Sequence, residues 1–186
     1  MQPKKKNEKP CKCPHCGANM IIHGHRISKG LSKTLLKFKE SVIKHDRNMI
    51  HIKDEVSFTK SEFTNFQKLR YHGLVAKYLD PITKKHIAGY WLLTKRGNLF
   101  CKNMISLPVI VYTFRNKIVQ KHEEKTNIMG IMQDDYLPYW DEKEDFPFEF
   151  ADVMDIEEIQ FDVNGQGLLA LFNLKDDEDN DFDLDK

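Results

Sequence analysis

Three closely spaced cysteines, Cys11, Cys13 and Cys16, are the residues of this chain whose types and spacing most directly indicate chemistry. Two residues separate Cys13 from Cys16, a spacing that lets both thiolates reach one Zn²⁺ ion at about 2.3 Å. The following glycine, Gly17, allows the backbone to turn tightly beneath such an ion. Bunched cysteines in a reducing compartment indicate a metal rather than a disulfide, so we expect a zinc site here.

The CPHCG segment resembles one knuckle of a zinc ribbon, which supplies two of the four ligands that a structural zinc site needs. The sequence contains no second cysteine pair at this spacing. The favoured ligands are Cys13 and Cys16 with His23 or His25, and Cys11 competes with the histidines. The alternative is a ribbon that has lost its metal. No HExxH motif or nearby carboxylate supplies a general base, so the expected role of the zinc is structural. The full set of candidates for the remaining ligands is Cys11, His15, His23, His25 and Cys101.

A long helix and a short strand are expected directly after the cysteine segment. Apolar residues recur at helical spacing from Ile27 to about His45, and Ser28 or Ser32 can cap the start of this helix. The weak alternation from Met49 onwards predicts a short strand that pairs with a later hairpin. The apolar stripe of the helix consists of Leu31, Leu35, Phe38 and Val42.

A second helix and a hairpin are expected between residues 58 and 97. Thr59 or Ser61 can cap the helix, and Gly73 is its natural left-handed end. Strand-like runs follow over 74–79 and 87–94, on either side of a basic turn. Thr94 is expected to cap a further short helix, and the glycine at position 97 to permit close packing.

The order of these features resembles that of a winged helix-turn-helix, and within that superfamily its MarR-like branch. The resemblance rests on a helix, a glycine, the GLV strand, a basic hairpin and the LTKRG helix, and it covers about forty residues. The segments NFQKLRYHGLV, GYWLLTKRG and VYTFRNKIV also look like those of uncharacterised bacterial and phage proteins. The resemblance implies a fold more strongly than it implies a function.

The outer face of the second helix carries residue types that contact bases and phosphates. At about 100° per residue, Phe63, Phe66 and Leu69 fall on the inner side together with Arg70. Asn and Gln side chains can bond adenine bidentately, and Lys can reach guanine or a phosphate. An ordinary solvated helix face is the alternative. The outer residues expected to contact nucleic acid are Thr64, Asn65, Gln67, Lys68, Tyr71 and His72.

The basic hairpin carries Lys84, Lys85 and His86 at or near its tip. The winged-helix resemblance assigns these residues contacts with the phosphate backbone. Each such contact would steepen the salt dependence of binding, because it releases condensed counterions from the nucleic acid. The alternative is that these residues are polar only because a hairpin tip is exposed to solvent.

Charge is strongly segregated, although the net charge is only +1. Residues 1–133 contain 26 Lys and Arg and nine Asp and Glu, which gives a net charge of +17. Residues 134–186 contain three Lys and Arg and 19 Asp and Glu, which gives a net charge of −16. The basic part is the footprint expected of a nucleic-acid binder. Residues 175–186 contain seven acidic residues and are expected to form a disordered tail that recruits a protein partner, covers the basic surface or only aids solubility.

These observations predict an α+β fold: a winged helix-turn-helix with an N-terminal zinc knuckle, a small β extension and an acidic disordered tail. The β extension could also form a homodimer contact. The expected units are a basic disordered arm over 1–10, the zinc knuckle over 11–26, the winged-helix domain over 27–107, the β-hairpin extension over 108–133, a partly ordered acidic segment over 134–174 and the tail over 175–186.

The predicted function is non-enzymatic binding of nucleic acid, with duplex DNA as the preferred ligand and a regulatory or replication-associated role. One alternative is a protein-interaction module that uses Tyr71, Tyr90 and Trp91. The other is a single-stranded-DNA-binding protein with an acidic tail. Motifs for phosphate loops, nucleophiles or paired carboxylates are missing, which argues weakly against an enzyme. We expect a cytoplasmic protein without a membrane partner, because no apolar run approaches the roughly 20 residues of a membrane span and no signal peptide is evident.

Overall fold

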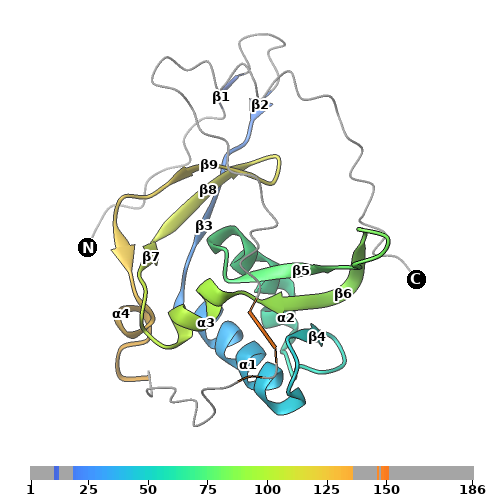
Figure 1. Ribbon diagram of the computed structural model, residues 1–186. Helices are drawn as coiled ribbons and strands as arrows, with labels where there is room; N and C mark the ends of the chain where they lie inside the picture. The colour runs from blue at the N-terminus through green and yellow to red at the C-terminus, as the bar shows by residue number, and fades with distance from the viewer. Residues whose placement is uncertain (1–10, 13–18, 136–145, 147, 151–186) are drawn as a thin grey trace.

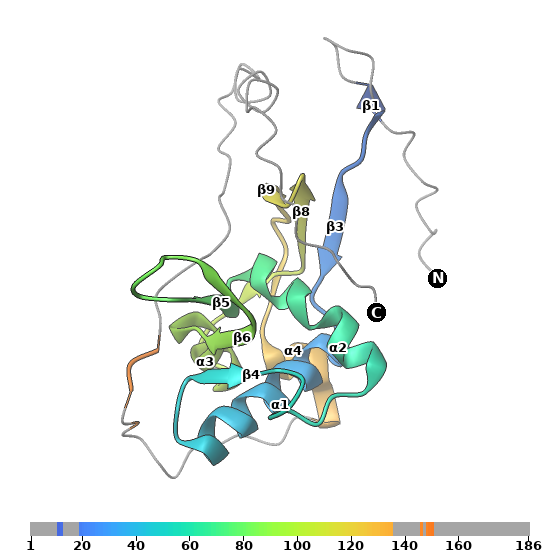
Figure 2. The ribbon, with the colours of Figure 1, turned by 90° about the vertical axis from the view of Figure 1, so that its right-hand side faces the viewer.

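The structure of the 186-residue chain is a computed structural model that describes residues 11–12, 19–135, 146 and 148–150. These residues form an α+β fold in which helices pack against small antiparallel sheets (Figures 1 and 2). The α+β class expected from the sequence is therefore confirmed. Within the described part of the chain, no helix is both long enough and apolar enough to cross a bilayer.

Among the described residues, most of the helical ones lie in the first half of the chain. Its elements are β1 (Cys11–Lys12), β2 (Asn19–Met20), β3 (His23–Arg26), α1 (Lys29–His45), β4 (Met49–His51), α2 (Lys60–Phe66), the 3-10 helix η1 (Gln67–His72) and β5 (Val75–Leu79). The second half is richer in strands. Its elements are β6 (His86–Leu93), α3 (Lys95–Cys101), β7 (Leu107–Pro108), β8 (Ile110–Phe114), β9 (Lys117–Lys121), β10 (Lys125–Thr126), α4 (Ile128–Met132) and the 3-10 helix η2 (Gln133–Asp135).

Helix α1 forms the centre of the core. Its predicted apolar stripe is buried, and Leu35, Phe38 and Val42 are completely inaccessible to solvent. The Ser28 hydroxyl accepts a hydrogen bond from the backbone N–H of Leu31, so Ser28 is the cap. Helices α2, α3 and α4 and the strand β4 all contact α1, which makes it the common support for the other elements.

A three-stranded antiparallel sheet in the order β4-β6-β5 lies beside α1. The predicted strand after α1 is confirmed, although it ends at His51, and it pairs with β6 as expected. The Asn48 side chain continues this pairing, because its Nδ2 donates to the Leu93 carbonyl at 3.0 Å and its Oδ1 accepts from the Leu93 N–H at 2.8 Å. The β5–β6 hairpin projects beyond the body of the molecule (Figures 1 and 2).

A second antiparallel sheet has the order β3-β8-β9 and joins segments that the sequence had placed in separate units. Strand β3 belongs to the predicted zinc-knuckle segment, whereas β8 and β9 belong to the predicted β extension. The core is also continuous across residue 107, because Leu107, Ile128 and Met132 pack in the same buried cluster as α1. The boundaries expected at residues 26 and 107 therefore do not separate structural units.

The second predicted helix differs from the expectation in its length and type. Thr59 is its cap, as expected, and forms a capping box with Glu62. The α-helix ends at Phe66 and continues as the 3-10 helix η1, whose left-handed end is Gly73 with φ 69°. Phe63, expected to face inward, is 42% exposed.

Helix α3 approaches the start of β5 very closely. The Thr94 hydroxyl accepts from the Gly97 N–H at 2.9 Å and donates to the Gly73 carbonyl at 2.7 Å. A Cβ added at Gly97 would overlap the carbonyl oxygen of Leu74. The expectation that a glycine is needed here for close packing is confirmed.

Little of the predicted acidic C-terminal part is described. Phe148 and Phe150 are half-buried and pack against the core, as does Ile131 just before the acidic residues begin. The basic arm over 1–10, most of the acidic segment and the whole tail over 175–186 lie outside the described residues.

Candidate nucleic-acid interface

The outward face of α2 and the start of η1 is ordered by contacts among its own side chains. Thr64, Gln67 and Lys68 are exposed, and Asn65 is half-buried. The Lys68 Nζ donates to Asn65 Oδ1 at 2.7 Å, and Asn65 Nδ2 donates to the Ser61 carbonyl at 2.8 Å. Four of the six residues predicted on this face are therefore on the surface, and two of them form a linked pair.

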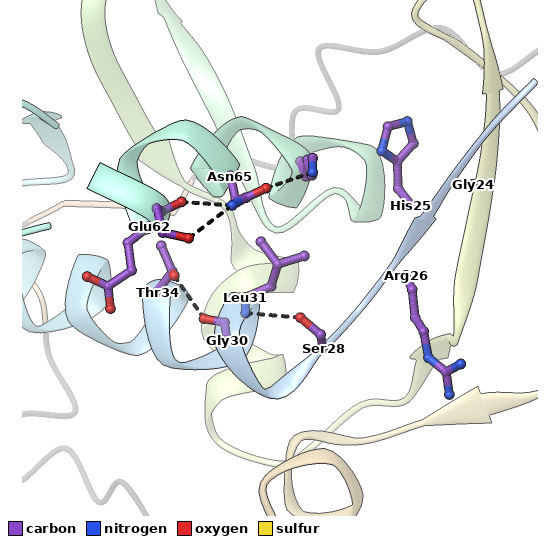
Figure 3. Close-up of a pocket in the computed structure, with 11 residues that line it drawn as sticks. Gly24, His25, Arg26, Ser28, Gly30, Leu31, Thr34, Glu62 and Asn65 are labelled. Carbon is purple, nitrogen blue, oxygen red and sulfur yellow. Dashed lines mark hydrogen bonds between the residues drawn. The ribbon is translucent and has the colours of Figure 1, made fainter. Parts of the chain in front are cut away.

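A hollow of about 350 Å³ lies beside this face, between α2, the strand β3 and the start of α1 (Figure 3). Asn65 and Lys68 form one wall, and Arg26 lies on the β3 side. Ser28 and the first turn of α1 complete the lining. Figure 2 shows α2 and η1 between β3 and the β5–β6 hairpin, so the hollow lies on the side of α2 away from that hairpin.

The charges around the hollow favour an anion. Glu62 is the acidic residue in its lining, and it is bound to Lys37 on α1 at 2.7 Å. The hydrogen bond from Lys37, followed by that from the Thr59 N–H, lowers the pKa of Glu62, so its charge is matched within the α1–α2 contact. Arg26 and Lys68 then leave an excess of positive charge, and the N-terminus of α1 adds the positive end of its helix dipole.

Tyr71 and His72 do not belong to the exposed face, so this part of the prediction is wrong. Tyr71 is 9% exposed and His72 is 4% exposed. Tyr71 is covered by its contacts with His25 and Asn116. His72 is buried because η1 is a 3-10 helix, in which residues three apart lie on the same side. His72 thus shares the inner side with the fully buried Leu69, whereas an α-helix would have turned it outward.

Tyr71 and His25 connect η1 to the β3-β8-β9 sheet. Their rings stack with centroids 4.0 Å apart, and the Tyr71 hydroxyl donates to Asn116 Oδ1 at 2.9 Å. The His25 Nε2 bonds to the Thr113 hydroxyl at 2.8 Å. Burial, and then the nearby charge of Lys68, lower the pKa of His25 to about 4.

The contacts of His25 bear on the predicted zinc site. Because its Nε2 is used by Thr113, the exposed His23 fits better as a ligand beside Cys13 and Cys16. Cys13 and Cys16 lie outside the described residues, but the paired strands β1 and β2 bring the two ends of their segment together. Among the described residues no three His, Cys, Asp or Glu side chains gather closely enough to hold a metal, so zinc stays a prediction.

The tip of the β5–β6 hairpin is exposed and is internally bonded. Lys84, Lys85 and His86 are all exposed, as predicted, although His86 is already the first residue of β6. Asp80 Oδ1 accepts from the N–H groups of Ile82 and Thr83 at 2.8 and 3.2 Å. These two bonds, in that order, lower the pKa of Asp80. The tip therefore presents two lysines on a defined turn.

The aromatic residues proposed as contacts for a protein partner are mostly in the core. Trp91 is 6% exposed and packs edge-on against Phe66, with ring centroids 5.2 Å apart. Tyr71 is buried as well, and the half-buried Tyr90 packs against His51. These positions remove the main sequence feature that favoured a protein-interaction module.

Two contributors to this surface were not found from the sequence. Arg26 lines the hollow from β3, together with Gly24 and His25. Asp135 bonds both Lys29 and Lys33 on α1 at 2.9 Å, and these bonds lower its pKa to about 2. The basic HGHR segment was the available signal for Arg26, whereas nothing local predicted Asp135.

Comparison with known protein families, with curated proteins and with solved structures found no match. The winged-helix resemblance therefore rests on the sequence motifs quoted above. The functional interpretation rests on the charges and contacts of the surface formed by α2, the hollow and the hairpin tip.

Proposed function

We propose that this chain binds nucleic acid without catalysing a reaction, and that its ligand is duplex DNA. The observation that carries the proposal is the pairing of Asn65 and Lys68 on an exposed helix face, beside a hollow that also contains Arg26. Amide and ammonium groups are the ones that bond base edges and phosphates. The basic excess of residues 1–133 supplies the long-range attraction to a polyanion.

The arrangement of elements supports a winged-helix mode of binding. The chain order α1, β4, α2–η1, β5, β6, with the strands paired as β4-β6-β5, leaves the β5–β6 hairpin as the wing. One departure is that η1 follows α2 without an intervening turn, and its last residues are buried. The contact surface would then be the end of α2, through Thr64, and the start of η1, through Gln67 and Lys68.

The size of this surface fits a DNA groove. With its side chains an α-helix is about 10–12 Å across, close to the roughly 12 Å width of the major groove, so α2 has the diameter to enter it. In this arrangement Asn65 and Gln67 would face base edges, and Lys68 and Arg26 would meet phosphates. Lys84 and Lys85 on the wing would contact the backbone next to the site.

Replacing both wing lysines tests the function through its salt dependence. For wild-type protein, the logarithm of the association constant for a fluorescein-labelled duplex should fall linearly with the logarithm of salt concentration. Lys84→Ala with Lys85→Ala should reduce that slope by about 2, because each lost phosphate contact removes about 0.9. Fluorescence anisotropy between about 50 and 300 mM salt measures both slopes.

A matched control removes two exposed lysines that lie away from the wing tip, Lys44 and Lys53. Lys44→Ala with Lys53→Ala changes the net charge equally and should leave the slope within about 0.5 of the wild type. Equal slopes for the two double variants would exclude the wing contact. Absence of any duplex binding by the wild type would exclude the function itself.

A further inference from the structure

The tip of the β5–β6 hairpin carries an isoleucine in an unusual position. Ile82 is 90% exposed, the highest value for a large apolar side chain among the described residues. Burial of such a side chain normally stabilises a protein, and this stabilisation is absent when the side chain is exposed at a hairpin tip. The two strands behind the tip add Leu79 and Ile87, which are 40% and 38% exposed.

The turn that carries Ile82 is held by five hydrogen bonds. The Asp80 carboxylate accepts from the N–H groups of Ile82 and Thr83, as described above. The Asp80 N–H donates to the Lys85 carbonyl, and the Lys84 N–H donates to the Asp80 carbonyl, both at 2.9 Å. The Lys85 N–H donates to the Thr83 hydroxyl at 3.4 Å. Ile82 is therefore presented on a preorganised loop. Because this loop is already ordered, it loses less conformational entropy when a ligand binds.

The charges beside Ile82 define the kind of surface it fits. Lys84 and Lys85 are exposed on the same turn, and the carboxylate of Asp80 is occupied by backbone N–H groups. A single apolar side chain flanked by ammonium groups is complementary to a narrow groove that has anionic walls and a floor of stacked bases. The minor groove of DNA, about 6 Å wide, has this composition.

We propose that Ile82 enters the minor groove of duplex DNA and wedges between adjacent base pairs while Lys84 and Lys85 hold the flanking phosphates. This inference rests on the proposed function and adds the groove and the mode of contact. Apolar side chains inserted in this way partly unstack one base step and kink the duplex. Flexible pyrimidine–purine steps such as TA are the expected sites, because they unstack at the lowest cost.

A lipid surface is the competing partner for an apolar and basic tip. Membrane-bound segments insert a broad apolar face and place their basic residues against the anionic headgroups. Here the fully exposed apolar group is a single side chain, and Leu79 and Ile87 remain more than half covered. A single exposed apolar side chain therefore favours insertion into a base step over binding to a lipid surface.

The test uses the full chain and duplexes that carry the fluorescent base 2-aminopurine within a central TA step. Wild-type protein should increase the 2-aminopurine emission at least about twofold, because the base loses its stacking partner. Ile82→Ser should abolish this increase and weaken binding about tenfold in anisotropy measurements. The salt slope should stay unchanged, because isoleucine displaces no counterions.

Met104→Ser is the matched control, since Met104 is 67% exposed and lies outside the hairpin. This variant should keep both the emission change and the affinity of the wild type. Duplex binding without an emission change, at equal affinity for Ile82→Ser, would overturn the wedge and leave the proposed function intact. Failure of the wild type to bind any duplex would overturn both. Ile82-dependent binding to vesicles of phosphatidylcholine and phosphatidylserine, without an emission change, would overturn the wedge in favour of the lipid surface.

Discussion

Gly97→Ala is expected to lower the free energy of unfolding by about 2 to 3 kcal/mol, the upper part of the range of about 1 to 3 kcal/mol that is typical of overpacked cores. An added Cβ would overlap the Leu74 carbonyl oxygen and lie 2.9 Å from Leu93 Cδ1. Neither atom can move easily, because Leu74 accepts from the Thr94 N–H and Leu93 is completely buried. The result is opposite to helix propensity, which favours alanine over glycine by about 1 kcal/mol. Urea denaturation followed by circular dichroism measures the change.

The matched control is Gly30→Ala in the first turn of α1. The nearest atom to an added Cβ there is the Ser28 hydroxyl oxygen at 4.0 Å, so the methyl group has room. This variant should be as stable as the wild type or more stable, by up to about 1 kcal/mol. If both variants shifted the urea midpoint in the same direction, the close approach of α3 to β5 would be contradicted.

The protein is expected to lose about 2 kcal/mol of stability between about pH 7.5 and pH 5 through His72 alone. Burial is the main cause that lowers the pKa of His72 from 6.5 to about 4, and the charges of His25 and Arg96 act in the same direction. The backbone of His25 acts in the opposite direction and offsets part of this effect. The unfolded chain binds a proton near pH 6.5 and the folded chain does not, so the stability is complete above that pH and falls as the pH decreases towards 4.

His72→Phe should flatten this pH dependence, because a phenyl ring keeps the buried volume and cannot bind a proton. His25 adds a smaller loss in the same pH range, since it is only half-buried and solvent screens its interactions. His86→Phe, at an exposed histidine, is the control and should keep the wild-type profile. Each variant is compared with its own stability at about pH 7.5 by urea denaturation. Parallel profiles for His72→Phe and the wild type would contradict the buried neutral histidine.

Features that depend on neighbouring residues were predictable from the sequence. Thr94 was correctly expected as a helix cap, and Ser28 and Thr59 were each one of two caps expected for their helices. A hydroxyl placed before a helical apolar pattern satisfies free N–H groups of the first turn. Gly73 was correctly expected as a left-handed helix end, since glycine adopts positive φ without strain. The exposed wing tip followed from the turn-forming residues at 80 and 81.

Features that depend on distant contacts were not predictable in the same way. The change from α2 to a 3-10 helix follows from tertiary packing, with Leu69 in the core and Tyr71 between His25 and Asn116. The pairing of β3 with β8 joins residues almost ninety positions apart, so no local pattern indicated it. As a result, the exposure of Thr64, Gln67 and Lys68 was predicted correctly. The burial of Tyr71 and His72 at the end of η1 was not predicted.

The central claim is that the outward face of α2 and the start of η1, which bears Lys68, contacts duplex DNA. The affinity of Lys68→Ala tests it most directly. The matched control is Lys44→Ala, since Lys44 is an exposed lysine in the last turn of α1, at the opposite end from the hollow. Filter binding at one fixed salt concentration, with excess single strand as competitor, should give about tenfold weaker duplex binding for Lys68→Ala and wild-type affinity for Lys44→Ala. Equal affinities for the two variants would contradict the claim.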